Sequence, residues 1–159
     1  MAFREMALRR LQISIVHMRM RLTALRLDLG KSASEAYMCE TGMVLAEISY
    51  MLKHMRQFGK DQTVRTPLAQ FASRSFRKPS PYGVTLIMSP WNYPFLLTME
   101  PLVDALAAGN TAIVKPSAYS PFTSEIMEKI ISECLPQKYV AVVNGGRKEN
   151  QWLLKEKFD

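Results

Sequence analysis

The chain has 159 residues, of which 48% are hydrophobic and 22% are charged, with a formal net charge of +7. These values are typical of a globular protein, and the length allows one domain with a hydrophobic core but not two complete ones. No apolar run reaches the roughly 18 residues that a membrane-spanning helix needs, so no membrane association is expected.

The positive charge would suit a nucleic-acid partner. However, the N-terminal arginines alternate with apolar positions, which favours a solvated helix face, so no nucleic-acid binding is expected: Arg4, Arg9, Arg10, Arg19, Arg21 and Arg26. Glu5 and Asp28 interrupt this basic stretch, and no apolar signal-peptide core is present, so no targeting segment is predicted. Two cysteines without a metal-binding spacing are typical of a reducing, cytoplasmic location.

Two amphipathic helices are predicted in the first sixty residues. The first carries apolar residues in steps of three and four and ends at Gly30: Leu8, Leu11, Ile15, Met18, Leu22, Leu25 and Leu29. The second begins after Ser32 or Ser34, repeats the spacing and ends at 58–61: Tyr37, Thr41, Val44, Ile48, Met51 and Met55. We expect an antiparallel pair that covers downstream strands, although the stripe alone would also allow a free-standing coiled coil.

Residues 63–81 form a predicted linker, because Pro67, Pro79 and Pro81 punctuate polar and aromatic residues. One extended, partly exposed segment is expected at 73–78, as a possible oligomerisation strand. The linker divides the chain into N-terminal helices at 1–62 and a second region at 82–159.

Residues 82–159 alternate between strand and helix patterns. A buried strand is expected at 83–89, with further strands at 111–115 and 139–143. Helices are predicted at 94–108, from the cap residue Ser120 to about 135, and from about 148 to 157. Such alternation implies parallel strands with right-handed crossovers, so the fold class is α/β with an incomplete parallel sheet.

Polar groups follow the first two of these strands, at the edge where open α/β sheets bind ligands. The amide of Asn92, next to Trp91, could donate a hydrogen bond to an oxyanion formed by attack on a carbonyl. Alternatively, Asn92 makes an Asx turn or caps the following helix. Lys115 could reach ribose hydroxyls or a phosphate, or it could be an ordinary solvated lysine.

The third strand is followed by a tight turn at 144–146, Asn-Gly-Gly. Glycines there would let a ligand approach the backbone, although any tight loop also needs them. The Gly-x-Gly-x-x-Gly fingerprint of many dinucleotide sites is absent.

The remaining residues with chemical potential are interpreted as structural. His17 and His54 lie in the predicted helices without a partner constellation. Cys39 and Cys134 have no nearby histidine or helix N-terminus that would activate a thiolate, so neither is a predicted nucleophile. No metal site is predicted.

Two segments resemble aldehyde dehydrogenases: 89–95, Ser-Pro-Trp-Asn-Tyr-Pro-Phe, and 109–117, Gly-Asn-Thr-Ala-Ile-Val-Lys-Pro-Ser. The similarity covers almost the whole chain in the correct order. Its upstream part resembles the early helices of the class-3 or fatty-aldehyde branch, and the supporting segments are 28–32, 35–37, 40–48, 139–146 and 153–159. The chain is therefore interpreted as an N-terminal fragment of such an enzyme, holding the leading helices and the first half of a Rossmann-like domain.

The resemblance implies NAD(P)-dependent oxidation of aldehydes to carboxylic acids. In the family a cysteine thiolate attacks the aldehyde, hydride passes to the nicotinamide, and a glutamate assists hydrolysis of the thioester. The residue matching Asn92 helps to hold the oxyanion, and the one matching Lys115 binds ribose hydroxyls. Further cofactor contacts are implied for Met88, Ser89, Pro90, Trp91, Ser117 and Gly145.

Two departures from the family pattern matter. The family usually carries a glutamate three residues after that lysine, where this chain has Ala118. Loss of that acceptor would weaken discrimination for NAD and remove repulsion against the extra phosphate of NADP, so both cofactors stay open. The family's catalytic cysteine, its general-base glutamate and its next strand have no counterpart up to Asp159.

We therefore expect this chain alone to be inactive, with a non-catalytic nucleotide- or protein-binding remnant as the alternative. The resemblance implies a small-molecule aldehyde as substrate and a homo-oligomer, a dimer, for the full-length enzyme. An incomplete parallel sheet leaves an unpaired strand edge, so the isolated chain is expected to self-associate.

Overall fold

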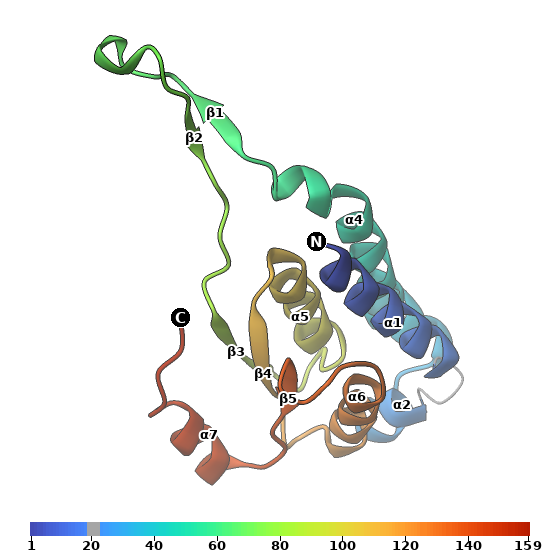
Figure 1. Ribbon diagram of the computed structural model, residues 1–159. Coiled ribbons are helices and arrows are strands. Elements are labelled where there is room, and N and C mark those ends of the chain that lie inside the picture. Colours follow the sequence, from blue (N-terminus) through green and yellow to red (C-terminus); the bar gives the residue numbers. More distant parts are fainter. Residues whose placement is uncertain (19–22) are drawn as a thin grey trace.

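A computed structural model describes residues 1–18 and 23–159. Its N-terminal region consists mainly of helices in the described residues (Figure 1). The elements are α1 (Ala2–Met18), α2 (Thr23–Leu29), α3 (Ala33–Ala36), the π-helical turn η2 (Tyr37–Thr41) and α4 (Gly42–Phe58). No helix in the described ranges combines the length and the apolar character that crossing a membrane requires.

The expected first helix corresponds to α1 and α2 in the described residues, which leave out 19–22. α1 ends at Met18 and α2 begins at Thr23, and both pack against the same downstream helix, α6 (Pro121–Cys134). Gly30 ends α2 as predicted, with a left-handed φ of 69° and its N–H donated to the Arg26 carbonyl at 2.9 Å. Of the predicted positions, Leu22, Arg19 and Arg21 lie outside the described residues.

α1 and α4 form the antiparallel pair. Arg56 near the end of α4 forms an ion pair with Glu5 near the start of α1, and Gln12 donates to Ser49 Oγ at 3.1 Å. Both helices also contact α5 (Leu96–Ala108), so they cover the sheet region and do not stand alone as a coiled coil. Ser32 caps α3 as predicted, because its hydroxyl accepts the Glu35 N–H at 3.2 Å.

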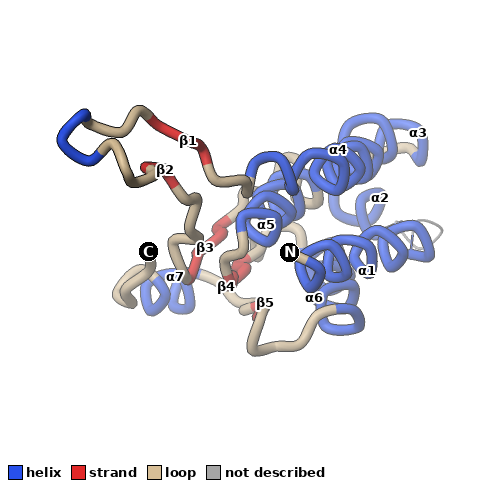
Figure 2. The backbone as a smooth tube through the Cα atoms, turned by 45° about the horizontal axis from the view of Figure 1, so that its top comes forward, coloured by secondary structure: helices blue, strands red, loops and turns tan. Residues whose placement is uncertain are grey.

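A two-stranded arm projects away from the helices and the main sheet (Figures 1 and 2). It pairs β1 (Gln62–Val64) with β2 (Ser75–Arg77) in antiparallel register, and a short 3₁₀ helix, η3 (Leu68–Gln70), lies at its tip. β2 falls within the expected extended segment. β1 and η3 were not predicted, because three-residue elements in a polar segment leave no periodic signal.

The main sheet holds β3 (Val84–Met88), β4 (Thr111–Lys115) and β5 (Val140–Val142), all parallel and in the order β3-β4-β5. This confirms the α/β class with an incomplete parallel sheet. α5 joins β3 to β4, and α6 joins β4 to β5. These two helices lie on the same side of the sheet as α1 and α4, whereas α7 (Arg147–Leu153) lies on the other side (Figures 1 and 2).

One hydrophobic core fills the space between the helices and the sheet. It joins fully buried side chains of α1, α4, the segment into α5, α5, β4 and α6, among them Leu8, Leu11, Ile48, Phe95, Leu102, Leu106, Val114, Met127 and Ile130. The expectation of a buried first strand is wrong for most of β3, where only Ile87 is buried. β3 lies at the edge of the sheet and packs against α5, and most of its residues stay partly or fully exposed.

Two helix boundaries and one helix cap differ from the sequence prediction. α5 begins at Leu96 and not at Pro94, and α7 runs from Arg147 to Leu153 and not to 157. Ser120 occupies the N-cap position of α6, but its side chain makes no capping hydrogen bond. The carboxylate of Asp28 accepts the first backbone N–H groups of α6 instead.

Candidate functional site

The carboxyl ends of the three parallel strands meet at one edge of the sheet. Met88 at the end of β3 is in register with Lys115 at the end of β4, and Ser89 N–H donates to the Lys115 carbonyl at 3.2 Å. Val143, just after β5, donates its N–H to the Val114 carbonyl at 2.9 Å. Residues far apart in the sequence are thereby brought side by side, as the predicted topology requires.

A cleft of about 330 Å³ opens at this edge. Four of the predicted cofactor residues line it: Met88, Ser89, Lys115 and Ser117. The other lining residues are Pro116, Ala118, Tyr119, Gly146, Arg147 and Asn150. Three further predicted residues, Pro90, Trp91 and Gly145, are not among the residues that line this cleft.

Lys115 lies at the base of the cleft. The residue is only 3% exposed, and its ammonium donates a hydrogen bond to the Pro116 carbonyl at 2.7 Å. Burial lowers the pKa of Lys115, and the nearby Glu149 carboxylate opposes that shift. The solvated-lysine alternative is therefore not what the structure shows.

The turn after β5 is shaped by Glu149. Its carboxylate accepts the Gly146 N–H at 2.7 Å, and backbone hydrogen bonds of this kind lower the pKa of Glu149. A Cβ on Gly145 would lie 2.4 Å from Cγ of Glu149, and Gly145 has a φ of 143°, so only glycine fits there. Gly145 is thus required by the close approach of a side chain, while its neighbour Gly146 faces the cleft.

The Trp-Asn turn follows β3 and is open to solvent. Trp91 is 53% exposed, and Asn92 is also exposed. Across the described residues, the Asn92 side-chain amide takes part in no hydrogen bond. The Asn92 side chain therefore forms neither an Asx turn nor a helix cap. The first N–H groups of α5 are accepted by another residue. The amide is therefore available to an incoming acceptor.

That other residue is Glu40 of η2, which sequence reasoning missed. Its carboxylate is fully buried and accepts the N–H of Phe95 at 2.8 Å and of Leu96 at 3.3 Å. It also pairs with the Lys31 ammonium at 2.5 Å. Lys31 in turn donates to the Asn92 carbonyl at 3.2 Å. A glycine soon after the acid, Gly42, was the available signal for a special backbone at this point.

The cysteines and histidines lie away from the cleft. Cys134, at the end of α6, donates to the Ile130 carbonyl at 3.0 Å, and burial raises its pKa to about 11. Cys39 belongs to η2. The Nδ1–H of His54 donates to the Tyr50 carbonyl at 2.8 Å, and its ring lies beside the Tyr50 ring. In residues 1–18 and 23–159, no group of three or more potential metal ligands comes together.

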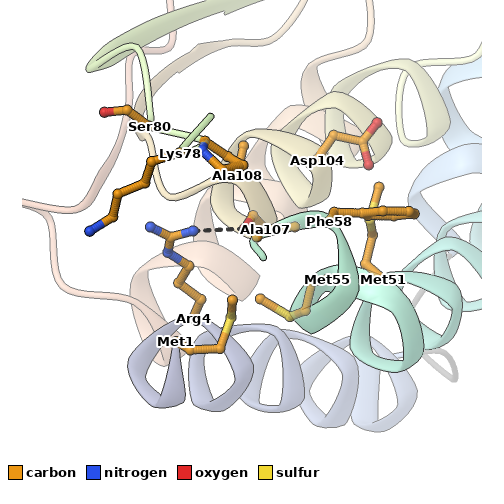
Figure 3. Close-up of a pocket in the computed structure, with 12 residues that line it drawn as sticks. Met1, Arg4, Met51, Met55, Phe58, Lys78, Ser80, Asp104, Ala107 and Ala108 are labelled. Atoms are coloured by element: carbon orange, nitrogen blue, oxygen red, sulfur yellow. Dashed lines mark hydrogen bonds between the residues drawn. The ribbon is translucent and has the colours of Figure 1, made fainter. Parts of the chain in front are cut away.

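A second cavity of about 380 Å³ lies between the N-terminus of α1, the end of α4 and the end of α5 (Figure 3). Met1, Met55 and Phe58 supply apolar lining, and Arg4 donates to the Ala107 carbonyl at 3.3 Å. α5 ends at Ala108, shortly before β4 begins at Thr111, so this cavity lies near the amino ends of the strands. None of the predicted site residues lines it.

Comparison with known proteins agrees with this geometry. Residues 2–157 match the model of the aldehyde dehydrogenase family. The 4,4'-diaponeurosporen-aldehyde dehydrogenase of Staphylococcus aureus is 44% identical over 138 residues, which are 87% of this chain and 30% of that protein. Aldehyde dehydrogenase family 3 member A2 of Mus musculus is 43% identical over 138 residues, 87% of this chain and 28% of that protein.

Solved structures show the same similarity. The substrate-bound state of Staphylococcus aureus AldH has a TM-score of 0.96 at 41% identity, covering 99% of this chain and 35% of that one. An NAD+ complex of a Bacillus cereus aldehyde dehydrogenase has a TM-score of 0.79 at 24% identity and shares the fold, covering 91% of this chain and 29% of that one. The chain spans about 30% of the length of the curated relatives it matches. Because the match to the family model covers residues 2–157 of the 159 in this chain, the chain belongs to the aldehyde dehydrogenase family.

Proposed function

We propose that this chain forms the part of an NAD(P)-dependent aldehyde dehydrogenase that receives the adenosine half of the cofactor and presents an oxyanion donor. The observation that carries the proposal is the pairing of Met88 with Lys115, which line one cleft, with the free amide of Asn92 four residues after Met88. In this role, Lys115 would bind ribose hydroxyls, and Asn92 would donate to the oxygen that becomes negative when the aldehyde is attacked.

The cleft residues fit part of a dinucleotide. A volume of about 330 Å³ is near the lower end of ligand pockets, which hold about 300–1,000 Å³. Within the described residues, Oδ1 of Asn150, a residue that lines the cleft, is a buried acceptor without a hydrogen-bond partner. Ala118 adds no negative charge, and Arg147 lies nearby, so this cleft should accept NADP as well as NAD. When bound, the nicotinamide cofactor supplies a hydride acceptor.

We also propose that these 159 residues alone do not oxidise aldehydes. The two cysteines lie outside the cleft, and Cys134 is held as a thiol because its pKa is about 11. A thiol at this pKa is a poor nucleophile at neutral pH. The chain therefore contributes binding and transition-state stabilisation, and the nucleophile belongs to another part of the enzyme.

The proposal is tested by nucleotide binding and turnover on the purified chain. Calorimetric titration should show binding of NAD+ or NADP+, and Lys115→Met should abolish it, while Lys138→Met, an exposed lysine outside the cleft, should not. Addition of an aldehyde with either cofactor should yield no reduced nicotinamide. Absence of nucleotide binding would remove the cofactor role, and aldehyde-dependent reduction would overturn the proposed inactivity.

The projecting arm is proposed to contact a second copy of the chain. Its tip exposes two large apolar side chains, Leu68 at 90% and Phe71 at 84%. Exposed apolar groups of this size on a protruding element are typical of association surfaces. A homo-oligomer, such as a dimer, is the arrangement this supports, with a cytoplasmic location proposed from the cysteine content.

A further inference from the structure

Two opposite charges are buried beneath the Trp-Asn turn. Glu40 of η2 is fully buried, and Lys31, which lies between α2 and α3, is 8% exposed. Removing two charges from water is costly, and a buried ion pair is weak evidence for stability by itself. The presence of this buried ion pair is better explained by the hydrogen bonds that its two members make to the turn and to the start of α5.

Glu40 holds the start of α5. One carboxylate oxygen accepts from Phe95 N–H at 2.8 Å and from Leu96 N–H at 3.3 Å, and the other pairs with the Lys31 ammonium at 2.5 Å. A carboxylate at a helix N-terminus satisfies unpaired N–H groups and interacts favourably with the helix dipole. The residue at which the turn becomes a helix is therefore fixed from a distant part of the sequence.

Lys31 holds the turn itself. Its ammonium donates to the Asn92 carbonyl at 3.2 Å and lies 4.1 Å from the centre of the Tyr93 ring. The backbone of Asn92 is thus held by a hydrogen bond from a buried side chain. The side chain of Asn92 is exposed and has no hydrogen bond within the described part of the chain, so the donors of its amide are unused.

The π-helical turn η2 places Glu40 at this point. Such turns insert an extra residue into a helix and are frequent at functional sites. Here the Gly42 N–H bonds to the Tyr37 carbonyl, and a Cβ on Gly42 would lie only 2.6 Å from that oxygen. Glycine at position 42 is consequently part of the same arrangement.

We propose that Lys31 and Glu40 are positioning residues for Asn92. Glu40 fixes where α5 begins, Lys31 fixes the Asn92 carbonyl, and the amide is thereby presented to the oxygen that develops negative charge. The inference rests on the proposed function for the role of Asn92, but the tethering can be measured without any ligand.

The test uses backbone NMR relaxation on the 159-residue chain. In the double variant Lys31→Met with Glu40→Gln, no buried charge is left unpaired, and the amide oxygen introduced at position 40 can still accept from Phe95 and Leu96. The thioether introduced at position 31 cannot donate to Asn92. The order parameters of Asn92 and Tyr93 should therefore fall from about 0.85 to below about 0.6, while the amides of Phe95 and Leu96 stay protected from hydrogen exchange.

The matched control removes the exposed ion pair between α1 and α4, as Glu5→Gln with Arg56→Met, and should leave Asn92 unchanged. Lys31→Arg, which keeps charge and donors, should retain the rigid turn. If the double variant does not fold, Lys31→Met alone provides the test: Glu40 still accepts from Phe95 and Leu96, the donor to the Asn92 carbonyl is lost, and the Asn92 order parameter should again fall.

A rigid Asn92 in the folded double variant, or in Lys31→Met where that replaces it, would overturn the proposal, because a merely structural pair would change the melting temperature alone. None of these measurements uses a nucleotide or an aldehyde. Failure of nucleotide binding would thus count against the proposed function only, whereas an unchanged turn would count against the positioning role only.

Discussion

Asp28, near the end of α2, caps the N-terminus of α6 through Thr123. One oxygen of the Asp28 carboxylate accepts both the backbone N–H of Thr123, at 2.7 Å, and its hydroxyl, at 2.6 Å. The other oxygen accepts the Phe122 N–H at 3.3 Å. The N-terminus of α6 is therefore satisfied by a side chain of the leading helices, which ties those helices to the sheet region.

Replacement of this cap should destabilise the fold. Asp28→Ala is expected to lower the free energy of unfolding by about 1 kcal/mol, as for other lost caps, whereas Asp28→Asn should lose less because it keeps an acceptor. Urea unfolding monitored by circular dichroism measures the difference. Asp61→Ala, at an exposed position after α4, serves as the control. Equal stability of Asp28→Ala and the parent would show that the cap contributes nothing.

A carboxylate at position 118 should change cofactor preference. Ala118 lines the cleft together with Lys115 and Arg147. In Ala118→Glu, repulsion should weaken NADP+ binding relative to NAD+ by about tenfold, which corresponds to about 1.4 kcal/mol. Calorimetric titration with each nucleotide gives the ratio, and Ser132→Glu, on an exposed part of α6, controls for the added charge. If the ratio of the two affinities did not change, the extra phosphate of NADP+ would not lie near position 118.

A pH effect on stability is expected from two acids that face each other across α4 and α5. Burial raises the pKa of Glu47, and the charges of Asp104 and Glu100 raise it further; burial also raises the pKa of Asp104. For acids with raised pKa values, stability is fully present below their ordinary values of 4.5 and 3.8 and is lost as the pH rises through the raised values.

Glu47→Gln should therefore stabilise the chain at neutral pH by up to about 0.5 kcal/mol, the size of a like-charge repulsion on a helix surface. The gain should vanish in acid, where the carboxyl groups are protonated. Thermal melts across this pH range test the prediction, with the exposed Glu125→Gln as control. A gain that is the same at every pH would contradict the assignment to these charges.

Self-association should depend on the arm. Leu68→Ser with Phe71→Ser removes the apolar tip and should shift the chain towards monomer in light scattering after size-exclusion chromatography. Val84→Lys adds a charge to the edge strand β3, which discourages strand pairing. If only this second variant yields monomer, association runs through the sheet edge and the arm proposal is wrong.

The local pattern predicted much of this protein. The strand at 111–115 was predicted at its observed bounds, because a short apolar run between Gly109 and Pro116 has few alternatives. The end of α2 at Gly30 and the cap at Ser32 were likewise predicted, since both depend on neighbouring residues only. Asn92 and Lys115 were predicted as site residues from their place after strands together with the family resemblance, and their functional roles stay predictions.

The sequence by itself therefore determined the α/β class and the parallel crossovers, which depend on short periodicities, and it contains the residue motifs that carry the family resemblance. Only the tertiary structure decided that Glu40 lies beneath Asn92, that Asp28 caps α6, and that β3 is mostly uncovered. Glu40 and Phe95 are 55 positions apart in the sequence, and Asp28 and Thr123 are 95 apart. Contacts at such separations leave no periodic trace, because they are fixed by how whole helices pack against the sheet.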